Sequence, residues 1–514
     1  MSLSKKIVKG LSWDFIGITT INIIAILTSI VFVRILNSEI YGVFVILLNF
    51  YQLLVLFTSF GLDTTLLKYY SEWKTSEQYN TIVKVINFIV KFRAVITLIL
   101  GIIFLTSTGM ITDFIIKKPI EPLLIKLIGI FFIVSSFQGI FQQILIAEFE
   151  QKYINTILVT FFLLRFIAGV IQITFFNGGI KELILIYILA QAGLVICMFI
   201  RMLHYYKLNK FKSDISKVTK EIDAKKISSF AFFAYLIIVL GYVFGKGMDI
   251  FLIGKLLEDT REVTYYALAH GFSYMIISFS SRAFSGGIPL SVVAKLYTDK
   301  DFNGLRTFFT GFFEALYFFI IPMAAGAWML RFEIVNFLYG EGFEKVGAII
   351  GIFLITMIFL KFSSITSTFI IAMGWEKKLV VSRLILGGVN FTLDILFIPK
   401  WGALGAVLAS TIAGLSAGIY ETILFFILLK PKFPFKFIFK TILATSIMCG
   451  AVYLITTFWL DSFNKINIFI IALIGSIIYF SLTYVLKPLS KEYLDIIKSR
   501  KMKIGKILKH LTKM

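Results

Sequence analysis

Cysteine and histidine are scarce in this sequence of 514 residues, which has two cysteines and three histidines. Cys197 and Cys449 both lie inside apolar runs, where a thiol behaves as a small hydrophobic side chain. The histidines, His204, His270 and His510, show no metal-ligand spacing. We therefore expect no disulfide, no metal site and no bound cofactor.

Charged residues are also few, because they make up 16% of the chain against about 25% in a typical soluble domain. Hydrophobic residues make up 58%. A backbone in lipid must satisfy its hydrogen bonds within each segment, which favours helices. The composition predicts an all-α polytopic membrane protein. The first apolar run, 15–33, is too long for a signal-peptide core, so we expect it to remain as the first span.

About fourteen stretches are long and apolar enough to cross a bilayer, since a spanning helix needs about 20 such residues. They are 14–34, 43–63, 85–107, 123–147, 155–176, 181–203, 229–254, 264–292, 307–330, 346–373, 380–398, 402–429, 437–459 and 465–486.

Positive charge is unevenly distributed among the connections between these spans. The side that holds both termini carries about three times as many lysines and arginines as the other side, which places both termini in the cytoplasm. This topology accounts for most of the net charge of +22 without a nucleic-acid partner. We expect a multi-pass protein of the cell (plasma or inner) membrane.

The second half of the chain resembles the first when it is shifted by about 225 residues, as in transporters with two repeated halves. LIAEFEQKY (145–153) then falls beside IIAMGWEKK (370–378). Chance similarity between apolar helices is the alternative. The predicted parts are an N-terminal lobe of helices 1–6 (1–203), a basic cytoplasmic linker (204–228), a C-terminal lobe of helices 7–12 (229–429), two appended helices (430–486) and a basic amphipathic cytoplasmic tail (487–514).

Span twelve begins within the stretch FIPKWGALGAVLAST (397–411) and carries two stripes of small residues at intervals of four. The first stripe includes Gly402, Gly414 and Gly418, and the second includes Ala409. Small residues let helices approach closely in lipid. We therefore interpret this helix as packing scaffold and not as a binding site, with Pro399 in the turn before it.

Four stretches of this chain resemble motifs of the polysaccharide and O-antigen flippases, a family of the multidrug and oligosaccharidyl-lipid exporter superfamily with a MATE-like fold. They are KGLSWDFIG (9–17), RILNSEIYG (34–42), FGLDTTLLKYY (60–70) and IPKWGALGAVLAST (398–411). The last is similar to the family's IP-x-x-G-x-x-G-A motif, and the likeness runs from about residue 5 to about residue 486.

The resemblance implies a transporter for cell-surface polysaccharide biosynthesis, which moves a polyprenyl-pyrophosphate-linked oligosaccharide from the cytoplasmic to the outer leaflet by alternating access. It also implies a positively charged cavity lined by spans one, two, four, seven, eight and ten. The partners implied are this lipid-linked substrate and membrane lipids. We expect a monomer that associates with polysaccharide assembly enzymes.

Basic residues inside spans are candidates for binding the pyrophosphate, because intramembrane charge is costly and commonly functional. Arg282 lies in span eight, and its planar donor fork suits phosphate oxygens. Lys246 lies in span seven, three residues before Asp249. In one interpretation, the opposite charges of Lys246 and Asp249 simply neutralise each other on one helical face. In the other, the pair forms a coupling site, where a cation (H⁺ or Na⁺) competes with the lysine for Asp249.

Polar side chains follow the repeat-related spans four and ten, which suits the walls of a hydrated cavity, although hydrogen bonding between helices explains them equally well. Lys361 lies centrally in span ten, and Gln138 and Gln142 lie in span four. Asn22 and Gln52, in spans one and two, are further candidates for contact with the substrate.

Other charged residues fall outside the predicted cavity. Arg165 and Glu314 lie in spans five and nine, which the resemblance places away from the substrate. Lys91 and Arg93 are near enough to the cytoplasmic end of their span for their side chains to reach the interface.

Two alternatives to a flippase remain. One is an ion-coupled multidrug or metabolite exporter on the same fold, which favours an acidic residue in the N-terminal lobe; the predicted cavity residues are instead mainly basic. The other is a membrane enzyme, but every outer loop is short and no histidine-centred constellation exists. We therefore predict a transporter without enzymatic activity.

Overall fold

The computed structural model describes residues 3–458, with gaps at 116, 118–119, 216–223, 244, 283–292 and 294–295, and residues 467–490. All regular secondary structure in these ranges is helical. Residues 491–514, which contain most of the predicted amphipathic tail, lie outside the described residues.

The chain divides into two compact units, of which the first comprises residues 1–267 and 394–406. It also includes the beginning of α12 (Arg261–Arg282) and the end of α17 (Glu376–Trp401). Its complete helices are α1 (Leu3–Leu36), α2 (Ser38–Ser59), α3 (Leu62–Thr75), α4 (Tyr79–Thr106), α5 (Thr108–Ile115), α6 (Pro122–Ser135), α7 (Gln138–Ala147), α8 (Gln151–Phe175), α9 (Ile180–Ile215), α10 (Ala224–Val243) and α11 (Lys246–Leu256).

The second unit comprises residues 268–393 and 407–514. It contains the remaining parts of α12 and α17, together with most of α18. Its other helices are α14 (Phe302–Met329), α15 (Arg331–Tyr339), α16 (Glu344–Ala372), α18 (Ala403–Leu429), α19 (Phe435–Phe458) and α20 (Asn467–Leu486).

Twelve helices in the described ranges are long and apolar enough to cross a membrane, or thirteen when a bent pair is counted as one span. The sequence predicted about fourteen. The bent pair, α10 and α11, corresponds to predicted span seven. Predicted span eight (264–292) is helical as far as Arg282 in α12, and residues 283–292 lie outside the described residues.

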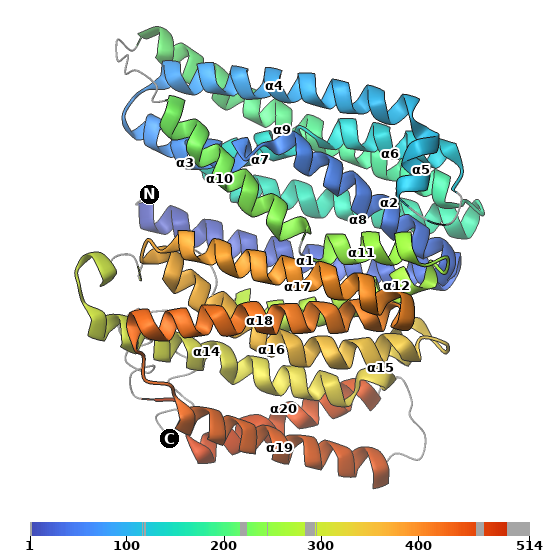
Figure 1. Ribbon diagram of the computed structural model, residues 1–514, viewed down its shortest axis with the longest axis vertical. Helices are drawn as coiled ribbons and strands as arrows, with labels where there is room; N and C mark the ends of the chain where they lie inside the picture. The colour runs from blue at the N-terminus through green and yellow to red at the C-terminus, as the bar shows by residue number, and fades with distance from the viewer. Residues whose placement is uncertain are drawn as a thin grey trace. The chain divides into compact units, whose positions relative to one another are not determined.

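The core of the first unit forms where α3 and α7 pack on α4 and α9 (Figure 1). Tyr70 and Trp73 of α3 are buried there against Ile144 of α7 and Met198 of α9. Aromatic and branched side chains fill this space because each helix presents an apolar stripe to its neighbours. The short helices α3 and α7 are therefore fixed in place by the longer ones.

A sharp turn separates α2 from α3, at the stretch FGLD that begins the third family-like motif, FGLDTTLLKYY (60–70). Phe60 and Gly61 have positive φ angles of 44° and 69°. A Cβ atom at Gly61 would lie 2.1 Å from the carbonyl oxygen of Ala231 in α10. Glycine is therefore required here both by the backbone conformation and by the close approach of α10.

The stretch IPKWGALGAV forms the turn between α17 and α18. Pro399 lies inside α17, so the prediction that it occupies the turn is wrong; the turn falls at Gly402, with φ of 62°. The Glu262 carboxylate accepts a hydrogen bond from the Ala403 amide at 2.7 Å. This acidic group satisfies an otherwise unpaired amide at the start of α18.

The small residues of α18 allow close helix packing, as predicted. Ala409 and Ala413 are fully buried. A Cβ atom at Gly414 would lie 2.6 Å from the Leu360 side chain of α16, and one at Gly418 would contact Ser363. Within the second unit, α18 therefore packs directly against α16.

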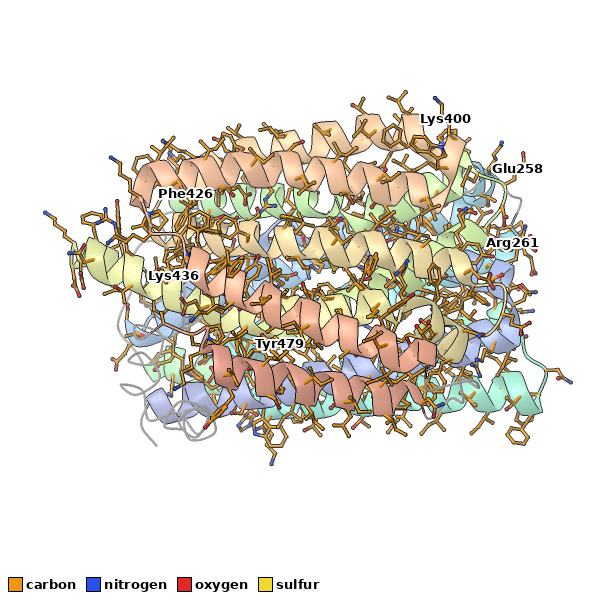
Figure 2. The ribbon with its side chains drawn as sticks, turned by 90° about the horizontal axis from the view of Figure 1, so that it is seen from below. Glu258, Arg261, Lys400, Phe426, Lys436 and Tyr479 are labelled. Carbon is orange, nitrogen blue, oxygen red and sulfur yellow. The ribbon has the colours of Figure 1, made fainter. Side chains whose placement is uncertain are left out.

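Aromatic side chains dominate the interior of the second unit. Phe309 lies between Phe369 and Phe425, with ring centroids 5.7 and 4.8 Å away. The paired helices α19 and α20 pack on α14, where the Tyr479 hydroxyl donates a 2.7 Å hydrogen bond to the Phe318 carbonyl. Figure 2 labels Tyr479 of α20, together with Phe426 of α18 and Lys436 of α19.

In the first unit, Glu258, Arg261 and Lys400 lie toward the same end of the view in Figure 2. Arg261 Nη2 lies 2.8 Å from the carboxylate of Asp259, and both side chains are substantially exposed. Such exposed pairs contribute little to stability, and we assign them to a water-facing end of the helices.

We predict that Gly402→Ala lowers the melting temperature of the purified protein, with a loss of about 1–3 kcal/mol. Its Cβ atom would lie 2.2 Å from the Glu262 carboxylate, at a positive φ. The control is Gly388→Ala in α17, where no atom lies within 4 Å and alanine favours the helix. Equal melting temperatures for both variants would contradict the explanation of the turn.

Candidate functional site

The bend between α10 and α11 is the most irregular backbone among the described candidate spans. The two helices meet at 48° between Tyr242 and Lys246. Non-helical backbone at membrane depth is tolerated where protein or a hydrated cavity surrounds it. Broken helices of this kind commonly form substrate sites in transporters.

Asn49 of α2 bridges the two halves of this broken span. Its amide nitrogen donates a 2.7 Å hydrogen bond to the Gly247 carbonyl in α11. The Tyr242 hydroxyl of α10 lies 2.6 Å from the Asn49 carbonyl and 3.0 Å from its Oδ1. A Cβ atom at Gly247 would lie 2.6 Å from the Tyr242 ring, so only glycine fits there. One side chain of α2 thus holds both ends of the bend.

Lys246 and Asp249 lie in different surroundings on α11. Lys246 is the first residue of the helix, and its side chain is exposed. Asp249 is 1% exposed and accepts a hydrogen bond from the Tyr266 hydroxyl of α12. The start of α11 therefore places a positively charged side chain at the positive end of the helix dipole, which is a suitable arrangement for an anion.

Gln138 and Gln142 lie at the start of α7, directly after the turn that follows α6. Their side chains are half-buried, and the Gln138 amide nitrogen lies 3.5 Å from Gln142 Oε1. The Gln191 amide of α9 donates a 2.6 Å hydrogen bond to Gln138 Oε1. Arg165 of α8 in turn donates to Gln191 Oε1. Two predicted site residues are thus joined to an arginine that the sequence placed outside the cavity.

The remaining predicted site residues are distributed over several helices. In the first unit, Asn22 of α1 is half-buried and Gln52 of α2 is exposed. In the second unit, Lys361 of α16 is half-buried. Arg282 is the last residue of α12, and its side chain lies outside the described residues. Gln138 and Gln142 lie within hydrogen-bonding distance of each other.

Arg93 does not extend to the membrane interface, so that prediction is wrong. The Arg93 side chain is 1% exposed, and Nη2 lies 2.9 Å from Asp63 Oδ1 of α3. Arg93 Nη1 donates to the Ser136 carbonyl at 3.1 Å, in the turn between α6 and α7. A Cβ atom at Gly139 would lie 2.6 Å from the Asp63 carboxylate. The ion pair therefore connects α3, α4 and the start of α7.

A second buried carboxylate, Glu421 of α18, lies in the second unit. It accepts hydrogen bonds from Ser363 and Ser367 of α16 and from Ser382 of α17. Arg383 Nη2 lies 3.6 Å from its Oε1. Three hydroxyl donors and a nearby cation satisfy this charge, which links three helices.

A third acidic group, Glu148, closes the turn between α7 and α8. It accepts a 2.6 Å hydrogen bond from the Tyr70 hydroxyl, and Lys74 Nζ lies 2.5 Å from its other oxygen. Asn209 of α9 donates to Tyr70 at 2.7 Å. Burial, together with the Glu148 carboxylate, raises the pKa of Tyr70, which keeps its hydroxyl a donor at neutral pH.

The sequence did not identify Asp63 or Glu421 as site residues, although both are acidic and lie at or within predicted spans. Asp14 of the first family-like motif was also left without a role, and it accepts a 2.7 Å hydrogen bond from Asn155 of α8. Their shared signal is an acidic residue in an apolar run, which predicts a buried partner on another helix.

We predict that Arg93→Met destabilises the protein by about 2–4 kcal/mol, because it leaves the half-buried Asp63 carboxylate without its counter-charge. Adding Asp63→Leu to this variant restores much of the melting temperature. The control is Lys91→Met in the same helix, where the lysine is exposed. Additive losses in the double variant would show that the two groups act independently.

Comparison with known proteins identifies similar transporters. A family model described as "Polysaccharide biosynthesis protein" matches residues 31–348, and a second, described as "Lipid II flippase MurJ", matches residues 287–474. The chain is 24% identical to "Uncharacterized membrane protein MJ1068" of Methanocaldococcus jannaschii, over 99% of this chain and 100% of that protein. It is also 24% identical to "Probable lipid II flippase MurJ" of Thermotoga maritima, over 42% and 46% of the two chains.

Solved structures of two transporters share the fold. The inward closed conformation of the lipid II flippase MurJ has a TM-score of 0.70 and 20% identity, over 91% of this chain and 97% of that one. The inward-facing conformation of a MATE multidrug resistance transporter has a TM-score of 0.62 and 14% identity, over 80% and 94%. These similarities confirm the predicted all-α, MATE-like fold of a multi-pass membrane protein.

Proposed function

Because the chain belongs to the polysaccharide biosynthesis protein family, whose model matches residues 31–348, we propose that it is a flippase for a polyprenyl-pyrophosphate-linked oligosaccharide. The cargo passes from the cytoplasmic to the outer leaflet of the cell membrane, with both protein termini in the cytoplasm. Transport proceeds by alternating access and involves no covalent step. The matching flippase family model and a relative named as a probable lipid II flippase support this proposal.

The observation that carries the proposal is the exposed Lys246 at the start of α11, where a predicted span is broken. An ammonium group at the positive end of a helix dipole is suited to pyrophosphate oxygens. The predicted cavity residues are mainly cationic or neutral polar. An anionic cargo is therefore favoured over the cationic drugs that a multidrug exporter carries.

We assign the cargo contacts by chemical type. Lys246, Lys361 and Arg282 bind the pyrophosphate, since each side chain ends in a hydrogen-bond donor that can carry a positive charge. The polar side chains contact sugar oxygens and neighbouring phosphate, and they are Gln138, Gln142, Asn22 and Gln52. The protein acts as a monomer beside the enzymes that assemble the polysaccharide.

The test is translocation of a fluorescently labelled polyprenyl-pyrophosphate oligosaccharide in vesicles containing the purified protein. We expect the protein to move label across the bilayer, measured as the fraction that an external quencher reaches. Lys246→Met should slow this movement about tenfold, since a hydrogen bond to a charged group is lost. The matched control is Lys255→Met, nine residues later at the other end of α11.

Failure of the wild-type protein to move the labelled lipid would reject the flippase proposal. Efflux of a cationic dye by the same vesicles would instead favour a multidrug or metabolite exporter. Equal rates for the two lysine variants would remove Lys246 from the cargo site while leaving the flippase proposal in place.

We further propose that Asp249 couples transport to a cation gradient, either H⁺ or Na⁺. Its carboxylate is buried in a candidate span beside the Tyr266 hydroxyl, and buried carboxylates of this kind commonly serve as proton or ion sites in transporters. Asp249→Asn should abolish the acceleration by an imposed gradient and leave gradient-free exchange intact. Glu421→Gln, an equally conservative change of another buried acid, should retain the acceleration. Unchanged gradient dependence in Asp249→Asn would assign the residue a structural role.

A further inference from the structure

A line of hydrogen-bonding side chains runs through the first unit from Arg165 to Gln142. Arg165 of α8 donates to Gln191 Oε1 of α9. The Gln191 amide nitrogen donates to Gln138 Oε1 of α7 at 2.6 Å, and the Gln138 amide nitrogen lies 3.5 Å from Gln142 Oε1. We call these four side chains the amide relay.

The arginine gives the relay a direction. A guanidinium group has five N–H donors and no acceptor, and it stays protonated in proteins. The carboxamide of Gln191 must therefore turn its oxygen to Arg165 and its nitrogen to Gln138. Gln138 must in turn offer its oxygen to Gln191, which leaves its NH₂ group on the side of Gln142. Each amide takes its orientation from the one before it.

The position of Arg165 is costly for a residue that only joins two helices. Its side chain is 8% exposed in the middle of a candidate span. The Phe162 and Tyr187 rings each lie 5.2 Å from its guanidinium carbon, which recovers part of the desolvation cost. A hydroxyl or a carboxamide would also join α8 to α9, but either group can accept as well as donate. A guanidinium cannot accept a hydrogen bond, so it excludes the opposite orientation of the amides.

We propose that Arg165 is a positioning residue that acts through Gln191 to present amide donors, and not carbonyl oxygens, at Gln138 and Gln142. This inference rests on the proposed function, because it takes these two glutamines as cargo contacts. It assigns the cargo group at this point of the site as a hydrogen-bond acceptor, such as a phosphate oxygen or a sugar oxygen. A cargo that offers N–H donors at this point would face the amide N–H groups of the glutamines and could not form hydrogen bonds with them.

The decisive variant is Gln191→Glu. A carboxylate at 191 still accepts from Arg165 and gains an ion pair, so the fold is retained. It cannot donate to Gln138, whose amide must then turn its NH₂ toward residue 191 and its oxygen toward Gln142. The polarity of the relay beyond residue 191 is thereby reversed without removal of any glutamine that contacts the cargo.

Binding to the purified protein in detergent micelles is measured with two probes. One is a polyprenyl pyrophosphate without sugar, and the other is a neutral glycolipid. We expect Gln191→Glu to weaken binding of one or both probes about tenfold. If Gln191→Glu weakens binding of the polyprenyl pyrophosphate, the acceptor on the cargo is a phosphate oxygen. If it weakens binding of the glycolipid, the acceptor is a sugar oxygen. The control is Gln172→Glu, which adds a carboxylate to α8 away from the relay.

Arg165 itself is tested by conservative replacement. Arg165→Lys keeps a charged donor and should retain most of the affinity, whereas Arg165→Met should lose as much as Gln191→Glu. Unchanged affinity for both probes in Gln191→Glu and in Arg165→Met would overturn the inference, while binding by the wild-type protein would leave the proposed function standing.

A measurement without cargo separates the two ideas. Arg165→Met and Gln138→Leu are combined in a double-mutant cycle of melting temperatures, first with Gln191 present and then with Gln191→Leu. A non-additive change in melting temperature that disappears in the Gln191→Leu background supports the relay. If the wild-type protein binds neither probe, that failure counts against the proposed function and not against the relay. Additive effects in both backgrounds would overturn the relay.

Discussion

The absence of water from the interior of the bilayer is the constraint on which the rest of this structure depends. Every polar group at that depth must find its partner on another part of the chain. Arg93 meets this requirement with Asp63 and the carbonyl of Ser136. Arg165 meets it with Gln191 and two aromatic rings. These polar contacts join helices to one another where apolar packing alone would leave their register undetermined.

The helices themselves could be predicted from the sequence because a spanning segment is a local property of about 20 residues. The stretch 155–176 corresponds to α8 (Gln151–Phe175), and 465–486 corresponds to α20 (Asn467–Leu486). The interruptions were harder to predict. The bend between α10 and α11 depends on Asn49, which lies nearly two hundred residues earlier in the chain, and hydropathy contains no information on that contact.

The candidate site was predicted only as far as single helices allow. Gln138 and Gln142 lie four residues apart, so their common face could be inferred from helical periodicity. Their connection to Arg165 passes through Gln191, which belongs to a different helix. The error at Arg93 has the same origin. Its distance from the end of its span suggested that it reaches the interface, whereas its true partner, Asp63, becomes a neighbour only when α3 packs against α4.

The bridge that Asn49 makes across the broken span has a mechanical consequence. Both α10 and α11 are hydrogen-bonded to one residue of α2. The angle between α10 and α11 therefore depends on the position of α2. A small rotation of α2 about its own axis would pull on both halves at once and change the direction in which the ammonium group of Lys246 points. In the first unit, the geometry of the bend therefore depends on the single residue Asn49.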